Sequence, residues 1–557
     1  MSLFIFSILT NFVYYCAGYI IQPHNKFGDN SIFFTFFLGT ITISLLGLFL
    51  NFFFPLDRLI NSLIYISIIF IFFLRNKFNV NKKVFFFLII SSLITFLLII
   101  KSNVNRPDAG LYHLPFVSIL NEHKIFFGLS NIHSRFAHIS IVQYLSAINN
   151  NYIFFNNGIS IPLASIVSFF YLYFIFDVWN IIKEKKSINV DKIFSMFILI
   201  YIAYKITRYS SFGNDAVAHL AYFYLISCVL KSNLKEVNIN KILLISVFIF
   251  VNKVMLGLVF FMPLTIFLIQ NNLKLDKILN QIFSLPILFL IIWLVKNIII
   301  SGCAIYPIKQ SCIEKLPWTN IKQIQNAHIE GQAWSKAWPD RMNKKISMKE
   351  FNKNFYWINA WKQKHLKYLM KIILPYIMFL FLITTFIRIQ NKQNKISNNE
   401  NNDFKKKIWL TLLISLIGTF SFFLIFPLYR YGYSYLITLI SLLFIIVIKK
   451  NTKVNGYIFI SKLVLILSIL AFVGKQSQKL IVNNKNGLLP NIYTLDNNIT
   501  KKIFKKQKVQ LDDNFHYFYA NKGDNLCMYS KSPCTSYLVN ENIKHIKKFT
   551  YSIFIIR

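Results

Sequence analysis

Apolar stretches long enough to cross a lipid bilayer recur from one end of this chain of 557 residues to the other. A helix of about 20 apolar residues spans the hydrocarbon core, and these runs are continuous, without the period of two that barrel strands need. We therefore expect an all-α polytopic membrane protein with about 13 or 14 transmembrane helices. The predicted spans lie near residues 3–22, 32–54, 58–74, 84–100, 159–182, 193–208, 215–231, 241–252, 254–270, 281–300, 367–388, 408–427, 432–449 and 456–473.

Positive charge sets the expected orientation of these spans. The chain has 61 Lys and Arg against 21 Asp and Glu, a formal charge of +40. A nucleic-acid-binding protein would carry this charge on a polar surface, so we expect no nucleic acid among the partners. Short basic loops mark the cytoplasmic side of a membrane. Six such connections fall on one side of the predicted spans, at 75–83, 183–192, 231–241, 274–277, 388–407 and 449–453.

The opposite, extracytoplasmic side then receives two large loops, 101–158 and 301–366, and the C-terminal tail. The tail changes to short mixed runs, such as 515–519 and 549–556, that read as strands. We therefore divide the chain into a transmembrane body, 1–473, and a small extracytoplasmic α/β domain, 474–557.

Four of the six cysteines form two local pairs in the regions placed outside the cytoplasm, Cys303 with Cys312 and Cys527 with Cys534. Disulfides persist in such compartments. A zinc site would favour closer spacing than either pair has. We expect two disulfides.

The stretch 241–270 is too long for one span and short for two, and Lys253 lies in its middle. A charge at the bilayer centre costs about 2.5–3.5 kcal/mol on insertion scales. This favours a hairpin of short helices whose turn places Lys253 at the outer surface or in a polar cavity.

The first outer loop carries the main candidates for chemistry. Asp108 follows the fourth span in a turn, ahead of a helical pattern from about 111 to 127. Capping of that helix is one explanation of Asp108, and acid–base chemistry is the other. His113, His133 and Arg135 follow in the same loop and suit contacts to a phosphate-bearing substrate.

The arrangement resembles the GT-C superfamily of glycosyltransferases, which take sugars from polyprenyl-phosphate carriers. The resemblance rests on a long helical membrane body whose first large outer loop begins with an Asp just beyond a span. It implies that Asp108 accepts the proton of an acceptor hydroxyl, or holds a divalent cation against the donor phosphate, while C1 of the sugar is displaced. GT-C enzymes often have two adjacent acids here, whereas Ala109 follows Asp108, so the metal is left open. The segments 108–115, 128–135, 301–307 and 533–535 also resemble a group of large bacterial membrane proteins.

Asp215 opens the span at 215–231 from the outer side and resembles an Asp that meets the donor phosphate or its metal in bacterial GT-C enzymes. Helix capping explains it equally well. His219, one turn further on, would share either role. Arg208 and Lys253 are the other cations expected to hold the leaving phosphate, and contact with lipid headgroups is their alternative.

Three features of the outer side have simpler explanations. The Tyr429-Arg430-Tyr431 turn fits an aromatic belt at the membrane interface. His328 and Glu330 give too few ligands for a metal site. The tryptophans of the second loop fit interface anchoring, with stacking on sugar rings as the alternative.

The predicted function is transfer of a sugar from a polyprenyl-phosphate donor to an acceptor on the outer face of a bacterial inner membrane, in contact with membrane lipids. The alternatives are a transporter or flippase of lipid-linked sugars and a polysaccharide polymerase or ligase. A transporter would show internal repeats and ionisable residues within its spans, and only Lys253 stands out in this respect.

Overall fold

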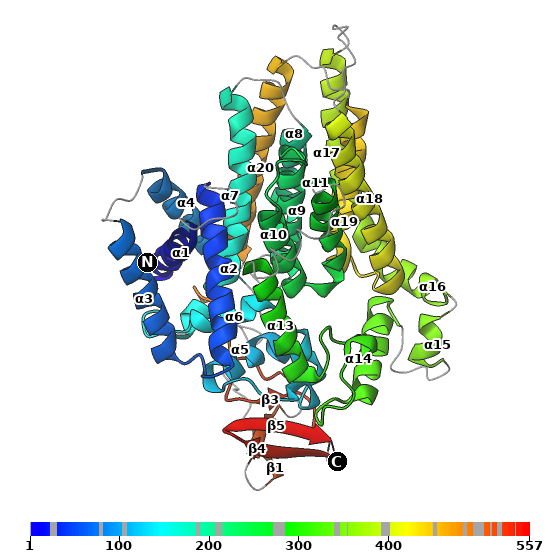
Figure 1. Cartoon of the computed structure of the whole chain (residues 1–557). Helices are drawn as coiled ribbons and strands as arrows, with labels where there is room; N and C mark the ends of the chain where they lie inside the picture. Colours follow the sequence, from blue (N-terminus) through cyan, green and yellow to red (C-terminus); the bar gives the residue numbers. More distant parts are fainter. Residues whose placement is uncertain are drawn as a thin grey trace.

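The computed structural model describes residues 2–22, 31–76, 82–102, 108–184, 190–205, 213, 215–270, 285–338, 346–353, 355–391, 402–448, 454–482, 487–493, 506–512, 515–520, 526–540 and 542–556. Helices make up most of this part of the chain (Figure 1). Nine of the described helices have the length and hydropathy of membrane spans. They are α1 (Ser2–Ile21), α2 (Ile32–Asn51), α3 (Arg58–Asn76), α4 (Lys82–Ile99), α7 (Ile161–Glu184), α17 (Lys367–Asn391), α18 (Asn402–Ile425), α19 (Tyr429–Val447) and α20 (Val454–Val482). The coarse prediction of a helical membrane protein is confirmed.

The other predicted spans also fold as helices, but shorter ones. They are α8 (Val190–Lys205), α9 (Asp215–Lys231), α10 (Ile239–Asn252), η7 (Val254–Phe260) with α11 (Phe261–Gln270), and α13 (Leu285–Ser301). Residues Ala216 to Leu230 of α9 are all buried among the surrounding helices. The count of 13 or 14 crossings stays a prediction for these shorter helices.

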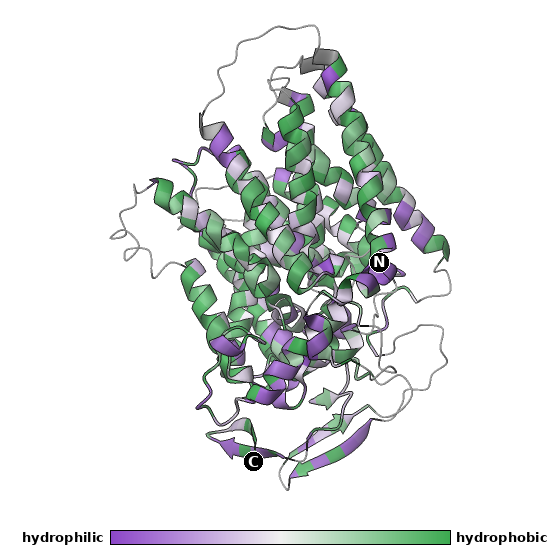
Figure 2. Cartoon of the chain, turned by 90° about the vertical axis from the view of Figure 1, so that its right-hand side faces the viewer, coloured by the Kyte–Doolittle hydropathy of each residue, from purple (hydrophilic) through white to green (hydrophobic). Residues whose placement is uncertain are grey.

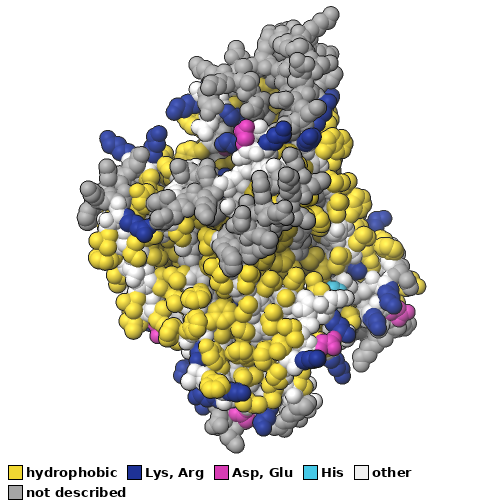
Figure 3. All heavy atoms as spheres, in the orientation of Figure 1, with side chains coloured by type: hydrophobic (Ala, Val, Ile, Leu, Met, Phe, Trp, Pro, Cys, Tyr) yellow, Lys and Arg dark blue, Asp and Glu magenta, His cyan; other side chains and the backbone are white. Residues whose placement is uncertain are grey.

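The outer surface of the helical body is apolar. Figure 2 shows hydrophobic residues along most of the helices and more hydrophilic ones around the loops near the C-terminus. Figure 3 shows a broad band of hydrophobic side chains across the middle of one face. Exposed hydrophobic residues of the helices include Leu382, Trp409 and Phe420, which are 61–63% accessible. Such a band matches the hydrocarbon layer of a bilayer.

Two glycines let α1 and α2 cross at backbone contact. A Cβ on Gly18 would lie 1.8 Å from the carbonyl oxygen of Thr35, and one on Gly39 would lie 1.7 Å from that of Tyr14. Close packing through small residues is a main source of cohesion between helices in membranes. This crossing holds α1 and α2 together.

The two large loops and the tail gather at one end of the helical body, while the far ends of α7, α17 and α20 point to the other (Figure 1). The first loop folds into η2 (Ala109–His113), α5 (Leu114–Glu122), η3 (Leu129–Asn131), η4 (Ser134–His138), α6 (Ile141–Ile148) and η5 (Phe155–Ser160). The second contains η8 (Lys309–Ser311), α14 (Ile321–Ser335), α15 (Met348–Asn352), α16 (Trp357–Trp361) and η9 (Lys362–Leu366). All three segments lie at the same end, as the charge pattern predicts.

The tail forms two small sheets on this end. Strands β1 (Gln507–Asp512), β2 (Phe515–Tyr519) and β3 (Cys534–Thr535) form one sheet, with β1 and β2 antiparallel and β3 parallel to β2. Strands β4 (Ile543–Lys548) and β5 (Tyr551–Ile556) form an antiparallel hairpin. The boundary predicted at 473/474 falls inside α20, which continues to Val482, and no helix is described beyond it.

The tail is joined to the first outer loop by backbone hydrogen bonds. Phe127 donates its N–H to the carbonyl of Ser552 at 3.0 Å and accepts from Phe554 at 2.9 Å. Met528 donates to the carbonyl of Gly110 at 2.9 Å. The tail therefore supports the segment that begins at Asp108.

Both predicted cysteine pairs lie at disulfide-bonding distance. The sulfur atoms are 2.06 Å apart in Cys303–Cys312 and 2.01 Å apart in Cys527–Cys534. Cys16 and Cys228 are buried and free. The first pair closes the loop that leads into the cavity described next.

Candidate active site

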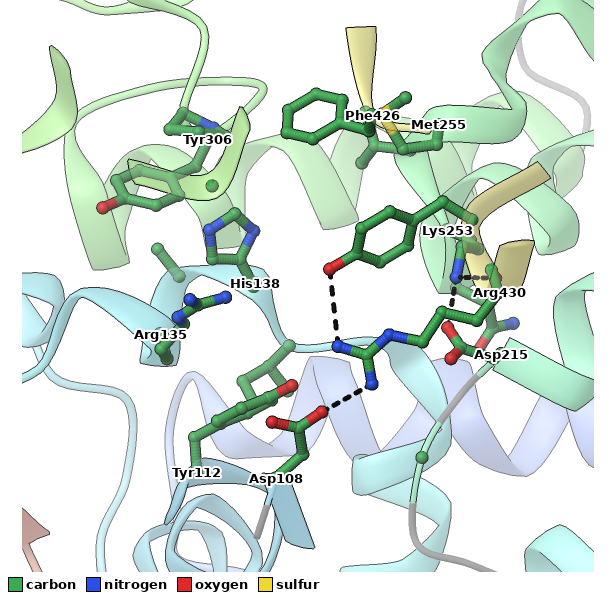
Figure 4. Close-up of a pocket in the computed structure, with 18 of the residues that line it drawn as sticks. Asp108, Tyr112, Arg135, His138, Asp215, Lys253, Met255, Tyr306, Phe426 and Arg430 are labelled. Carbon is green, nitrogen blue, oxygen red and sulfur yellow. Dashed lines mark hydrogen bonds and ion pairs between the residues drawn. The ribbon is translucent and has the colours of Figure 1, made fainter. Parts of the chain in front are cut away.

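A cavity of about 440 Å³ lies where the first outer loop meets the ends of α9, α10 and α19. Its other wall comes from the Cys303–Cys312 loop and α14. Figure 4 shows labelled side chains from the first loop, α9, α19 and the Cys303–Cys312 loop around it. Five of the predicted catalytic and substrate-binding residues line this cavity: Asp108, His113, Arg135, Asp215 and Lys253.

Asp108 is held by an arginine from a distant part of the chain. Nη1 of Arg430, in the first turn of α19, lies 2.7 Å from Oδ2 of Asp108. The Asp108 side chain makes no capping hydrogen bond to η2, so the capping explanation is wrong. The five residues after it form a π-helical turn, a feature that recurs at functional sites.

A second ion pair joins Asp215 to Lys253. Lys253 lies in extended conformation between α10 and η7, so the stretch 241–270 forms the predicted hairpin of short helices. Its ammonium contacts Asp215 and also donates to the backbone carbonyl of Arg430 at 2.9 Å. Lys253 is only 7% exposed. Arg430 therefore contacts Asp108 through its guanidinium, and its carbonyl accepts from Lys253, the partner of Asp215. Figure 4 shows the two ion pairs side by side.

His219 does not line this cavity. Its Nε2 lies 2.9 Å from the Arg430 carbonyl, and its Nδ1 lies 2.7 Å from the hydroxyl of Ser434. Its ring packs against that of Tyr433, with a distance of 3.7 Å between the ring centroids. His219 thus fixes the start of α19 and, through it, Arg430.

The first-loop histidines have different environments. Burial lowers the pKa of His113 to about 4, against an opposing effect of Asp108 and Asp215. Nδ1 of His113 lies 2.8 Å from the side-chain amide of Gln143, so the neutral ring accepts this hydrogen bond. His133 is buried away from the cavity, and its Nδ1 accepts from the backbone N–H of Arg135 at 3.1 Å. The structure brings Arg135 to the cavity but not His133.

His138 lines the cavity as well, although the sequence gave no reason to single it out. Its ring contacts Tyr306 edge to face at a centroid distance of 4.9 Å. The surrounding protein atoms and the charge of Arg135 lower the pKa of His138, although its side chain is exposed to the cavity. The ring is therefore neutral near neutral pH.

One predicted cation, Arg208, lies outside the described residues. Two other predictions are corrected by the structure. Lys253 is not the one ionisable residue of the apolar stretches, because Lys296 in α13 and Asp177 in α7 are also buried there. Arg430, which the sequence assigned to an aromatic belt, is a central cation of the site. The sequence signal that could have identified Arg430 is its position in a predicted turn on the same side of the membrane as Asp108.

A resident metal ion does not fit the described part of the site. No group of three or more His, Cys, Asp or Glu is close enough there to hold one. Asp108 and Asp215 are each paired with a cation. His328 and Glu330 both line the cavity from α14, but they have no third ligand among the described residues. We therefore derive no step through a metal.

Most of the chain matches one known protein family. The family profile described as "Domain of unknown function (DUF8201)" matches residues 1–437. The chain belongs to this family. All the residues that line the cavity, from Asp108 to Tyr433, lie within the DUF8201 match, whereas the strands of the tail lie beyond it. No curated protein and no solved structure matches the chain.

Proposed function

We propose that this protein transfers a sugar from a polyprenyl-phosphate donor to an acceptor at the outer face of a bacterial inner membrane. The observation that carries the proposal is one cavity at the loop end of the helices. In it the carboxylate of Asp108 shares the space with the guanidinium groups of Arg135 and Arg430. Glycosyl transfer needs both a proton acceptor and a cation for the departing phosphate.

Arg135 is the cation best placed to bind that phosphate. Arg430 and Lys253 each have a carboxylate partner. Arg135 forms no ion pair within the described residues, and its fork of N–H donors suits phosphate oxygens. Asp108, Arg135 and Arg430 line the same cavity of about 440 Å³, so their side chains can face one substrate.

The proposed step uses only these side chains. Asp108 accepts the proton of the acceptor hydroxyl as its oxygen attacks C1 of the donor sugar. The bond between C1 and the phosphate oxygen breaks, and polyprenyl phosphate leaves with the electron pair. Arg135 and Arg430 stabilise the negative charge that develops on it. The aromatic rings of the wall, such as Tyr112 and Tyr431, offer faces for the sugar.

The test is transfer by the purified full chain in lipid nanodiscs. Short-chain polyprenyl phosphates that carry different radiolabelled sugars serve as donors, and an envelope glycan extract serves as acceptor. We expect transfer by the wild type and loss of at least ~100-fold in Asp108→Asn, the range of general-base catalysis. Glu314→Gln, an exposed carboxylate paired with Lys309, is the control. Wild-type rate in Asp108→Asn would reject the role of Asp108.

A transporter of lipid-linked sugars is the second candidate. The observation that favours it is the burial of Lys296 and Asp177 within helices, since intramembrane ionisable residues often mark transport pathways. Movement of a fluorescent lipid-linked sugar across proteoliposomes, without a change in its glycosidic bond, would support transport and reject the enzyme.

A further inference from the structure

The two walls of the cavity differ in chemistry. The wall that contains Asp108 is built around Arg430 and Lys253, which are cations. The opposite wall is formed in part by α14, whose sequence from Ile321 to Ser335 is rich in amides and has a single cation, Lys322. The α14 residues that line the cavity are Ala327, His328, Glu330 and Gly331.

Residues outside the cavity hold α14 in place. Asn320 caps its first turn by accepting the N–H of Gln323 at 3.0 Å. The side chain of Gln323 donates to the carbonyl of Ser130 in the first outer loop at 3.1 Å. Asn352 donates to the carbonyl of Ile329 at 3.0 Å. The hydrogen bonds that anchor α14 to its neighbours therefore come from side chains other than those of Glu330 and His328.

Glu330 and Trp334 form a polar and aromatic ledge on α14. The indole N–H of Trp334 donates to Oε1 of Glu330 at 3.3 Å, and Trp334 is 36% exposed. Unlike Asp108 and Asp215, Glu330 has no cation partner within the described residues. A carboxylate in this state repels a phosphate and accepts hydrogen bonds from neutral hydroxyl groups.

His328 completes the neutral character of this wall. Burial, with a smaller effect of Lys336, lowers the pKa of His328, so its ring is uncharged near neutral pH. The ring stands edge-on to Phe426, at a centroid distance of 6.2 Å. A neutral imidazole offers one donor and one acceptor, a pairing that matches a hydroxyl group.

We infer that α14 binds a saccharide acceptor, whose hydroxyl groups hydrogen-bond to Glu330 and His328 and whose ring packs against Trp334. The inference rests on the proposed function, because a transfer reaction needs an acceptor beside the donor. It adds that the acceptor is a carbohydrate. The phosphate of the donor lies between Arg135 and Arg430, and the acceptor enters along the exposed edge of α14, which lies at the loop end of the molecule (Figure 1).

The test measures saccharide binding without any donor. The full chain in nanodiscs is applied to an array of neutral oligosaccharides of bacterial envelopes, and affinities for bound probes are measured by calorimetry. We expect Trp334→Ala and Glu330→Gln to bind at least ~10-fold more weakly than wild type. Trp409→Ala removes a lipid-facing indole that is 63% exposed, and Glu314→Gln neutralises a carboxylate that is 62% exposed, so both controls should bind as wild type.

The outcomes separate this inference from the proposed function. Loss of binding in the α14 variants, together with absent transfer from every donor, would leave the saccharide site standing and reject the transferase. Transfer that is equal in wild type, Trp334→Ala and Glu330→Gln would reject the saccharide site and leave the transferase standing. Absence of any bound oligosaccharide on the array would also overturn the inference.

Discussion

The guanidinium of Arg430 lies 2.7 Å from the carboxylate of Asp108, although 322 residues separate them in the chain. The pair brings the first outer loop to the start of α19, and both side chains remain partly exposed, at 44% and 35%. An ion pair with this exposure adds about 0.2–1 kcal/mol to stability at most. Its importance therefore lies in the placement of Asp108.

Removal of either member of this pair should reduce transfer far more than stability. We expect Arg430→Gln and Asp108→Asn each to lower transfer on the order of 100-fold, and the double variant to lose no more than the stronger single one. The free energy of unfolding, measured by thermal denaturation, should fall by about 1 kcal/mol or less. Effects on transfer that multiply in the double variant would contradict a joint role. Lys309→Gln, in a surface ion pair, is the control.

The ion pair between the buried Lys253 and Asp215 should matter more for stability than the pair of Asp108 and Arg430 does. Removal of one partner leaves a buried charge uncompensated, which costs about 3–5 kcal/mol. We expect Asp215→Asn to destabilise the protein by this amount. The double variant Asp215→Asn with Lys253→Met should recover much of the loss, because both charges are gone. Denaturation of the purified protein, monitored by circular dichroism, measures the stability of the single and the double variant. Equal stability of the two variants would show that Asp215 does not compensate the charge of Lys253.

His113 should make stability depend on pH in a defined window. Its pKa falls from the ordinary 6.5 to about 4 in the folded protein, mainly through burial. Below pH 6.5 the unfolded chain binds a proton that the folded protein excludes. The free energy of unfolding therefore falls as pH drops from 6.5 to about 4, by up to about 1.4 kcal/mol per pH unit.

A substitution isolates this contribution. His113→Asn keeps an acceptor for Gln143 but cannot titrate, so its stability should vary less with pH across this window than that of the wild type. His516, which is exposed on β2, provides the comparison, and His516→Asn should change the slope much less. Equal slopes in His113→Asn and wild type would show that His113 is not a neutral buried base.

Gly110 tests whether the tail supports Asp108. A Cβ at this position would lie 2.3 Å from the sulfur of Met528 and 3.2 Å from Cβ of Leu526. Overpacking of this kind costs about 1–3 kcal/mol. We expect Gly110→Ala to lower stability and transfer, and Gly110→Ala with Met528→Ala to restore both in part. Hydrogen exchange of residues 108–122 gives a readout that needs no substrate.

Reporter fusions test the orientation. A phosphatase that folds only outside the cytoplasm should be active when it is joined after Trp338 in the second loop and inactive when it is joined after Lys183. The first site lies at the end of the molecule that holds the tail, and the second at the end of α7 (Figure 1). Activity at both sites, or at the second alone, would reverse or reject the assigned sides.

Local patterns in the sequence account for most of the helices, because an apolar run specifies a span without information from its neighbours. The disulfides follow from short spacing and compartment. The site was predictable only in part. Asp108, Arg135, Asp215 and Lys253 share one outer side, which charge bias indicates, but the pairing of Asp108 with Arg430 depends on a contact between distant segments.

Two other assignments show the same limit. His133 has the residue type of a phosphate ligand, but its Nδ1 accepts a hydrogen bond from the backbone N–H of Arg135, two positions later. Glu330 lacked a third ligand for a metal, and its significance emerges only from the helix that carries it into the cavity. Residue type and spacing indicate the chemistry that is available, whereas the packing of the loops decides which groups meet.

The junction between β5 and the first outer loop also sets an order of assembly. Phe127 exchanges hydrogen bonds with Ser552 and Phe554, and Asn131 donates to the carbonyl of Phe554 at 2.9 Å. Phe554 follows Asn131 by 423 positions, so it is synthesised long after the loop that it supports. The wall of the cavity that this loop forms can therefore be completed only after β5 has been synthesised, and a chain cut before Ser552 should leave the loop without this support.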